Sequence, residues 1–203
     1  MKPVVLLLAL VPLGTLVAGV FGVAAFPLGA NPISRITDSL GLWGLRLLLL
    51  TLSLTPLRQL TGSAQWIRFR RMLGLSAFLY LTLHFAMYIA VDQSFDWSIL
   101  LEDVLRRPWI TLGFTALMLL VPLAVTSTRG WMRRLGRRWQ TLHRAVYVAA
   151  GLGCWHYWWQ VKRDVRDPML YAAAFAALML WRLWKARQRA TARAAAEAAA
   201  SAK

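Results

Sequence analysis

The segment from Arg70 to Asp92, RRMLGLSAFLYLTLHFAMYIAVD, decides the fold expected for this chain. Two arginines precede a run of about 20 mostly apolar residues, which is the length of helix that crosses a bilayer. An aspartate ends the run, and one histidine, His84, lies within it. The segment is therefore predicted to be a transmembrane helix that carries an imidazole inside the membrane.

Similar runs recur along the chain. Its 203 residues are 59% hydrophobic and only 16% charged, with a mean hydropathy of +0.51, whereas an ordinary soluble domain is about 25% charged. We predict an all-α, polytopic membrane helix bundle over residues 1–184, followed by a basic, alanine-rich cytoplasmic tail at residues 185–203. Six transmembrane helices are expected, at residues 4–26, 41–60, 72–91, 108–127, 140–160 and 168–184. The first run also resembles a secretory signal, but its length favours an uncleaved helix.

The formal net charge of +16 indicates orientation rather than nucleic-acid binding. Lys and Arg are enriched in the cytoplasmic segments of membrane proteins. Here the segments on one side are rich in arginine, and those on the other side are diluted by acids, which predicts a multi-pass membrane protein with both termini inside. The predicted cytoplasmic side contains Arg58, Arg68, Arg70, Arg71, Arg129, Arg133, Arg134, Arg137, Arg138, Arg144 and the tail; the other side contains Arg35, Arg106, Arg107, Lys162, Arg163 and Arg166.

The segment DQSFDWSILLEDVLRRP, residues 92–108, mixes large apolar side chains with four acidic ones. This composition favours a short helix that lies in the membrane interface on the outer side. Two interpretations stay open: an anchor held by lipid, or a docking surface for a partner outside the membrane.

All three histidines, His84, His143 and His156, fall in the third and fifth predicted spans. Ionisable residues inside membrane helices are costly, and they usually have a function. His84 comes thirteen residues after Arg71, and His156 comes eighteen residues after Arg138, so we expect both imidazoles in the outer half of the bilayer. Two neutral imidazoles that face each other across a helix bundle are the axial pair of a six-coordinate haem iron.

Other metal sites fit this chain poorly. Zinc requires three or four converging ligands, and no acidic residue lies within the apolar core of the histidine-bearing spans. Covalent c-type haem requires the motif Cys-x-x-Cys-His, whereas the only cysteine, Cys154, lies in the sequence GCWHY. Any haem is therefore expected to be b-type, and Cys154 to be a small buried apolar residue.

His143 stands thirteen residues before His156, which is about 20 Å along a helix. That separation suits a second redox site on the inner side of the membrane. The two side chains are, however, roughly 140° apart around an ideal helix, so they need not face the same neighbour. Gly151 and Gly153 lie between them and allow a local bend or a close helix approach, which weakens this objection without removing it.

Several stretches resemble one family of membrane haem proteins. They are RFRRMLGL, LTLHF, RRPWITLGF, LAVTST and LGRRWQTLHRAVYV, and the resemblance extends from Ile33 to Trp184. The family is MsrQ (YedZ), the haem-binding membrane subunits of bacterial periplasmic methionine sulfoxide reductase systems. It belongs to the ferric reductase-like transmembrane superfamily, whose members carry electrons across the membrane through b-type haem.

The resemblance implies a function, cofactors and partners. The chain would be a b-type cytochrome that carries electrons across the inner membrane to a periplasmic molybdenum-containing subunit, which reduces methionine sulfoxide in proteins. The implied cofactors are one or two haem b groups and FMN, and the implied electron donor is the quinone pool or a cytosolic flavin reductase. The sequence has neither a nucleophile beside a base nor a carboxylate pair, so no substrate catalysis is assigned to the chain itself.

The resemblance also implies roles for the histidines. Members of the superfamily have histidine pairs on their third and fifth helices, and the outer positions here are His84 and His156, the implied axial ligands. The inner position of the third span holds Arg70, so His143 lacks the usual partner. Three roles stay open for His143: the single protein ligand of a second haem, part of an inner flavin or quinone site, or a structural role.

Four arginines are further candidates for cofactor binding. Arg46 is expected either to pair with a haem propionate or to extend toward the outer surface. The inner arginines Arg70, Arg71 and Arg137 are expected either to hold a flavin phosphate or only to set the topology. The alternative functions are another quinol-oxidising b-type cytochrome anchor, a ferric reductase, and a transporter without a cofactor.

Overall fold

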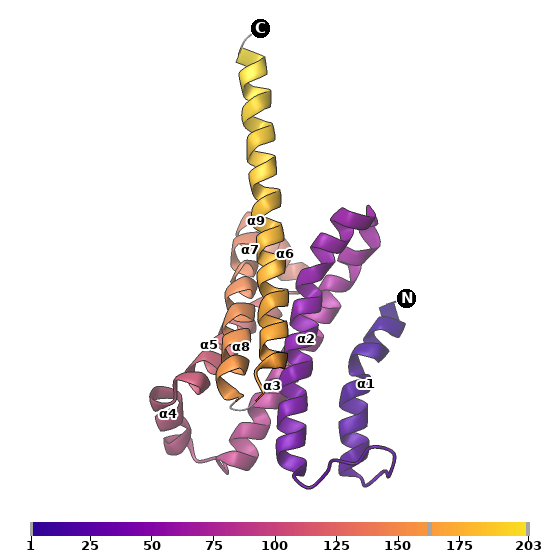
Figure 1. Ribbon diagram of the computed structural model, residues 1–203, viewed down its shortest axis with the longest axis vertical. Helices are drawn as coiled ribbons and strands as arrows, with labels where there is room; N and C mark the ends of the chain where they lie inside the picture. The colour runs from indigo at the N-terminus through magenta and orange to yellow at the C-terminus, as the bar shows by residue number, and fades with distance from the viewer. Residues whose placement is uncertain (1, 162–163, 202–203) are drawn as a thin grey trace.

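The computed structural model describes residues 2–161 and 164–201, and every regular element in them is a helix (Figure 1). The predicted all-α class is thereby confirmed. The longer helices are α1 (Lys2–Val20), α2 (Pro32–Thr61), α3 (Arg70–Met87), α5 (Pro108–Val125), α8 (Ala145–Gln160) and α9 (Arg166–Ser201). The shorter ones are the 3-10 helix η1 (Ala64–Phe69), the π-helix η2 (Tyr88–Asp92), α4 (Trp97–Arg106), α6 (Arg129–Leu135) and α7 (Arg137–His143). Lys162, Arg163 and the last two residues of the tail are not among the described residues.

Four stretches of the described chain are long and apolar enough to cross a membrane. They are Lys2–Val20, Pro32–Thr61, Ala64–Asp92 and Pro108–Val125. The prediction of a polytopic membrane protein is therefore confirmed. The fifth and sixth predicted spans are helical but do not meet this measure, because α8 has only 16 residues and α9 joins an apolar start to a basic continuation. The number of six spans stays a prediction.

Helix α2 begins well before the predicted start at residue 41. The side chain of Asn31 accepts a hydrogen bond from the backbone N of Ser34 (3.2 Å), and Pro32 occupies the first turn, both of which are typical of helix starts. The polar side chains of Ser34 and Asp38, which hydrogen-bond to each other at 3.0 Å, lower the hydropathy there and conceal the helix. The additional turns contain Thr37, which contacts the candidate site.

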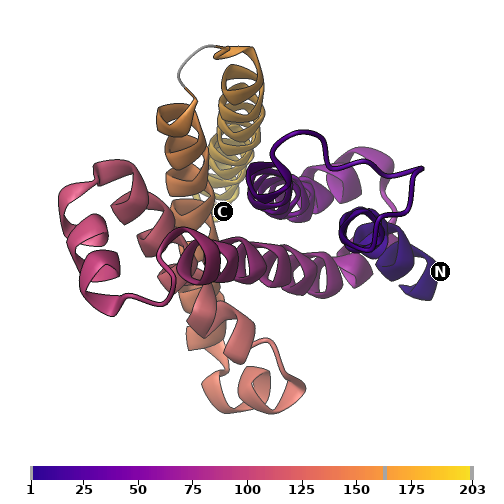
Figure 2. The same ribbon diagram turned by 90° about the horizontal axis from the view of Figure 1, so that it is seen from below.

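Four helices form the centre of the molecule. α2 packs along α3, α5 packs along α8, and further contacts between α3 and α5 and between α2 and α8 close the bundle. α3 and α8 therefore lie across the bundle from each other. α9 packs on α8 and α2, while α1 and α4 lie on opposite sides of this group (Figure 2).

Tyr80, a fully buried residue of α3, fastens α1 to the bundle. Its hydroxyl accepts a hydrogen bond from the backbone N of Leu13 (2.9 Å) and donates one to the carbonyl of Ala9 (2.9 Å). In an uninterrupted helix these two backbone groups would pair with each other. Tyr80 therefore bridges two backbone groups of α1 beside Pro12.

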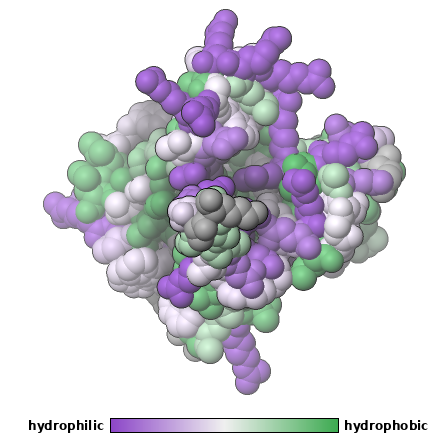
Figure 3. Space-filling view, turned by 90° about the horizontal axis from the view of Figure 1, so that it is seen from above, coloured by the Kyte–Doolittle hydropathy of each residue, from purple (hydrophilic) through white to green (hydrophobic). Residues whose placement is uncertain are grey.

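The start of α1 and the projecting part of α9 point toward the same end of the molecule, the upper end in Figure 1, although α1 begins well below the tip of α9. Viewed from that end, hydrophilic residues gather around α9 (Figure 3). The short helices α6 and α7 lie toward the same end and contribute exposed arginines, which are Arg129, Arg133, Arg134, Arg137 and Arg138. The division of the chain into a bundle and a separate tail stays a prediction.

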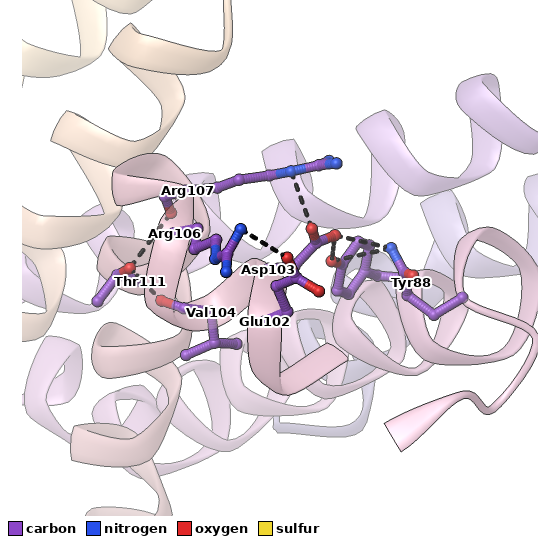
Figure 4. A network of polar contacts seen from close by, with 8 residues as sticks. Tyr88, Glu102, Asp103, Val104, Arg106, Arg107 and Thr111 are labelled. Atoms are coloured by element: carbon purple, nitrogen blue, oxygen red, sulfur yellow. Dashed lines mark hydrogen bonds and ion pairs between the residues drawn. The ribbon is translucent and has the colours of Figure 1, made fainter. Parts of the chain in front are cut away.

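The short helix predicted within residues 92–108 is present as α4, at the opposite end from the termini (Figure 1). One stripe of α4, formed by Trp97, Leu101 and Leu105, is exposed. On the other face Asp103 is buried and fixes α4 to the end of the α3 segment (Figure 4): it accepts hydrogen bonds from Tyr88 (2.7 Å) and Gln93 (2.9 Å). A position in the membrane interface stays a prediction for α4.

Candidate functional site

The structure brings His84 of α3 and His156 of α8 together across the bundle. The centroids of their imidazole rings are 6.2 Å apart, and the ring planes form an angle of 71°. Both side chains are half-buried, in a part of the bundle built mainly from apolar residues. The two residues come from helices that are not neighbours along the chain, so only the packing of the bundle creates this pair.

A backbone carbonyl fixes each ring. The Nδ1 atom of His84 lies 2.8 Å from the carbonyl oxygen of Thr37, and that of His156 lies 2.7 Å from the carbonyl oxygen of Trp109. A carbonyl oxygen only accepts, so both Nδ1 atoms donate, and in a neutral imidazole Nε2 then carries a free lone pair. Among the described residues neither Nε2 atom has a hydrogen-bond partner. This is the arrangement that metal-ligating histidines show in proteins.

Two glycines allow this arrangement. A Cβ atom added to Gly41 of α2 would lie 3.0 Å from Nδ1 of His84, and one added to Gly113 of α5 would lie 3.0 Å from Nδ1 of His156. A side chain at either position would press on the imidazole. The absence of one therefore lets each ring lie directly against the neighbouring helix.

The separation of the rings suits one metal ion between them. A metal–imidazole bond of about 2 Å on each side, together with about 1 Å from each nitrogen to its ring centroid, gives about 6 Å between centroids. Within residues 2–161 and 164–201 no group of three His, Cys, Asp or Glu side chains converges on a metal position. The pair therefore suits a metal whose remaining ligands come from a prosthetic group, as in haem.

Arg46 lies on α2, on the side that faces α9. Its Nε atom donates a hydrogen bond to the Tyr171 hydroxyl (2.8 Å), and its guanidinium lies 4.8 Å from the centroid of the Trp43 ring. The neighbouring residue Leu45 is 3.6 Å from the Cβ position of Gly153, which comes three residues before His156. Arg46 is thus held between side chains near the level of the histidine pair.

His143 is not part of the histidine pair. It ends α7, where its ring stacks on Trp139 with a centroid distance of 3.8 Å, and its Nδ1 lies 3.1 Å from the Trp139 carbonyl. Its Nε2 is buried and has no hydrogen-bond partner among the described residues. The free Nε2 makes His143 a separate candidate ligand, nearer the end of the molecule where the termini lie.

The inner arginines show no specific arrangement around a cofactor. Arg71 and Arg137 are exposed, and Arg70 is half-buried. Within the part of the chain that the structure describes, none of the three forms a salt bridge. Their contribution is positive charge at the terminal end of the bundle.

Sequence reasoning missed the residues that position the histidines. Thr37 and Trp109 act through backbone carbonyls, which any residue supplies, and Gly41 and Gly113 act through the lack of a side chain. A signal was present, because Gly41 precedes His84 and Gly113 precedes His156 by the same number of residues. The hydroxyl of Thr37 was also missed: it is buried and has no partner among the described residues.

Comparisons with known proteins found a family model and several close relatives that match this chain. The family model described as "Ferric reductase like transmembrane component" matches residues 40–154. A "Protein-methionine-sulfoxide reductase heme-binding subunit MsrQ" from Xanthomonas axonopodis pv. citri (strain 306) is 56% identical over 158 residues, covering 78% of this chain and 72% of the relative. A protein of the same name from Caulobacter vibrioides is 52% identical over 165 residues, covering 81% of this chain and 79% of the relative. No solved structure matches the chain.

Proposed function

We propose a function from the family to which this chain belongs: it is a member of the ferric reductase-like transmembrane family and, within it, of the MsrQ haem-binding subunits of protein-methionine-sulfoxide reductase systems. Its function is that of the haem-binding subunit in such a system. In our proposal the chain is a b-type cytochrome that carries electrons across the bacterial inner membrane. A periplasmic molybdenum-containing subunit receives them and reduces methionine sulfoxide in proteins.

His84 and His156 are the proposed axial ligands of one haem b. The observation that carries this assignment is the pair of rings 6.2 Å apart, each with Nδ1 bonded to a backbone carbonyl. The bound haem iron supplies one-electron transfer. The chain provides two fixed imidazoles, an apolar surrounding and carbonyl hydrogen bonds that increase the basicity of both ligands.

Two polar groups are proposed to hold the haem propionates. Arg46 lies near the level of the histidine pair, and its hydrogen bond to Tyr171 and its contact with Trp43 fix the guanidinium. Guanidinium groups bind carboxylates strongly. The buried Thr37 hydroxyl, next to the carbonyl that receives the His84 hydrogen bond, offers a further donor. Both groups come from α2.

His143 is proposed to line the site where electrons enter at the cytoplasmic side. Its Nε2 is the only ligand atom that we assign there, and the charges of Arg70, Arg71 and Arg137 favour an anionic group nearby. FMN, a second haem or a quinone fits this description, and the quinone pool or a cytosolic flavin reductase is the proposed donor. Two observations support this inner site: the positive charge of the nearby arginines and the free Nε2 atom of His143.

The proposed topology has six spans with both termini in the cytoplasm. The exposed arginines of α6 and α7 lie toward the end from which α9 projects (Figure 1), as is usual for cytoplasmic segments. α7 and α8 follow each other with only Arg144 between them, and Arg144 has helical φ and ψ angles. Together they are long enough to form the fifth span. α4 then lies on the periplasmic side, and its exposed stripe is proposed as the docking surface for the catalytic subunit.

The proposal is tested by purifying the protein and following its haem spectrum. We expect a low-spin b-type haem. The reduced electron donor should reduce it, and the catalytic subunit should reoxidise it when methionine sulfoxide is present. Reoxidation by the sulfoxide system separates this function from a ferric reductase or a different quinol-oxidising cytochrome. A protein without a Soret band would contradict the haem assignment and favour a transporter.

A further inference from the structure

The two halves of the histidine site repeat each other. Thr37, Gly41 and His84 become Trp109, Gly113 and His156 when 72 is added to each number. In both halves the residue whose carbonyl accepts the hydrogen bond lies 47 residues before the histidine, and the Nδ1–oxygen distances are 2.8 and 2.7 Å. In both halves the missing glycine Cβ would lie 3.0 Å from the ring. Helices α2 and α3 thus form one half-site, and α5 and α8 form the other.

The helices around these residues share the same offset. The identical pairs at this spacing are Leu40 and Leu112, Leu45 and Leu117, Leu47 and Leu119, Leu48 and Leu120, and Ala77 and Ala149. Most of these residues belong to the buried core. The same pattern of contacts therefore arises twice from independent stretches of chain. This repetition indicates that the carbonyl contact and the glycine contact have the same role in both halves.

The common role of these contacts is to orient the imidazole rings. Each histidine is attached to its own helix, hydrogen-bonded to the carbonyl of the next helix, and packed on the glycine four residues after that carbonyl. A methyl group 3.0 Å from the ring would displace the imidazole and lengthen the Nδ1–oxygen hydrogen bond. Because that bond increases ligand basicity and favours the ferric ion, weakening it raises the reduction potential of a haem bound by this pair.

We infer that Gly41 and Gly113 are positioning residues of the haem centre, one in each half-site, which fix the axial imidazoles and thereby hold the haem potential low. The inference rests on the proposed function, in which His84 and His156 ligate haem. It predicts equivalent effects from two glycines that are 72 residues apart and lie on different helices.

One other helical glycine, Gly74, provides a matched control. A Cβ atom at Gly74 of α3 would meet only Thr51 Cγ2, at 3.6 Å, which is an ordinary contact. Gly74 lies ten residues before His84 on the same helix. Substitution there tests the effect of adding a methyl group to the bundle without touching an imidazole.

The experiment measures the reduction potential and the low-spin EPR signal of the full-length, haem-loaded protein and of Gly41→Ala, Gly113→Ala and Gly74→Ala. We expect the first two variants to keep the haem, to shift the potential upward and to change the EPR signal, while Gly74→Ala matches the wild type. Unchanged potential and EPR signal in Gly41→Ala and Gly113→Ala would overturn the inference. A wild-type protein whose haem does not depend on His84 and His156 would instead contradict the proposed function.

A second background keeps the test decisive if Gly41→Ala does not accumulate. In His84→Gly, added imidazole can replace the missing ligand without attachment to the helix and can move away from a methyl group at residue 41. We therefore expect Gly41→Ala to accumulate in this background and to leave the potential of the imidazole-bound haem unchanged. Failure to accumulate there, or a full shift in potential, would show that Gly41 acts through helix packing and would overturn the inference.

Discussion

The imidazole planes of His84 and His156 are inclined at 71° to each other, closer to perpendicular than to parallel. The orientation follows from two separate carbonyl hydrogen bonds, to Thr37 and to Trp109, on two different helices. Each ring also packs on a glycine of the neighbouring helix, so its rotation is restricted.

This angle predicts a spectroscopic signature. Nearly perpendicular axial imidazoles leave two of the occupied ferric d orbitals close in energy, which makes the low-spin EPR signal strongly anisotropic. We expect the oxidised haem of the purified protein to show this type of signal at low temperature. A rhombic spectrum typical of parallel imidazoles would contradict the ring geometry.

Alanine substitutions should distinguish the role of His84 and His156 from that of His143. Since one haem iron needs both ligands, His84→Ala and His156→Ala should each abolish the same low-spin signal. His143→Ala should leave this signal in place and change only the haem stoichiometry or the rate of reduction by donor, because His143 packs on Trp139 away from the pair. Haem per polypeptide and the EPR spectrum of the three variants are the measurements. Equal loss in all three would show that the assignment of ligands is wrong.

The sequence predicted the helices better than their ends. Apolar runs predicted the segments that became α3 and α5, since long runs of that kind are stable as membrane helices. The first turns of α2 were missed because Ser34 and Asp38 satisfy each other within the helix, which hydropathy does not register. The extension of α9 to Ser201 depends on alanine, whose helix propensity needs no packing.

The candidate site was predictable only in part, for a physical reason. His84 and His156 were identifiable because an imidazole in an apolar span is costly and needs a function. Their relative orientation was not, since it depends on carbonyl groups that every residue has. Gly41 and Gly113 were accessible to sequence analysis only through the repeat of 72 residues, which appears once the two contacts are aligned.

The buried carboxylate of Asp103 should be important for holding α4 in place. It accepts hydrogen bonds from Tyr88 and Gln93 and pairs with Arg107 at 2.9 Å (Figure 4). Asp103→Ala would leave the Tyr88 hydroxyl without its acceptor, although Gln93 still donates to it, and we expect a loss of about 2 kcal/mol in the free energy of unfolding, within the range for hydrogen bonds to a charged group. Thermal unfolding in detergent measures this loss.

Glu102 provides the matched control for Asp103. It is the preceding residue on α4 and pairs with Arg106 at 2.9 Å, but both side chains are largely exposed. An exposed ion pair contributes less than about 1 kcal/mol. Glu102→Ala should therefore leave the unfolding temperature nearly unchanged, and similar losses for Glu102→Ala and Asp103→Ala would contradict the role assigned to burial.

Arg182 should stabilise the contact between α9 and α2 through a carbonyl that a proline leaves free. Pro56 lies inside α2 and has no N–H for the carbonyl of Leu52, and Arg182 Nη2 donates to that carbonyl at 2.6 Å. Arg182→Met would leave the carbonyl unpaired in an apolar region, at a cost of about 1–3 kcal/mol. The double variant with Pro56→Ala restores a backbone donor, so we expect it to unfold at a higher temperature than Arg182→Met alone. If Pro56→Ala gives no such recovery, Arg182 stabilises the bundle through its contact with Tyr147 rather than through the Leu52 carbonyl.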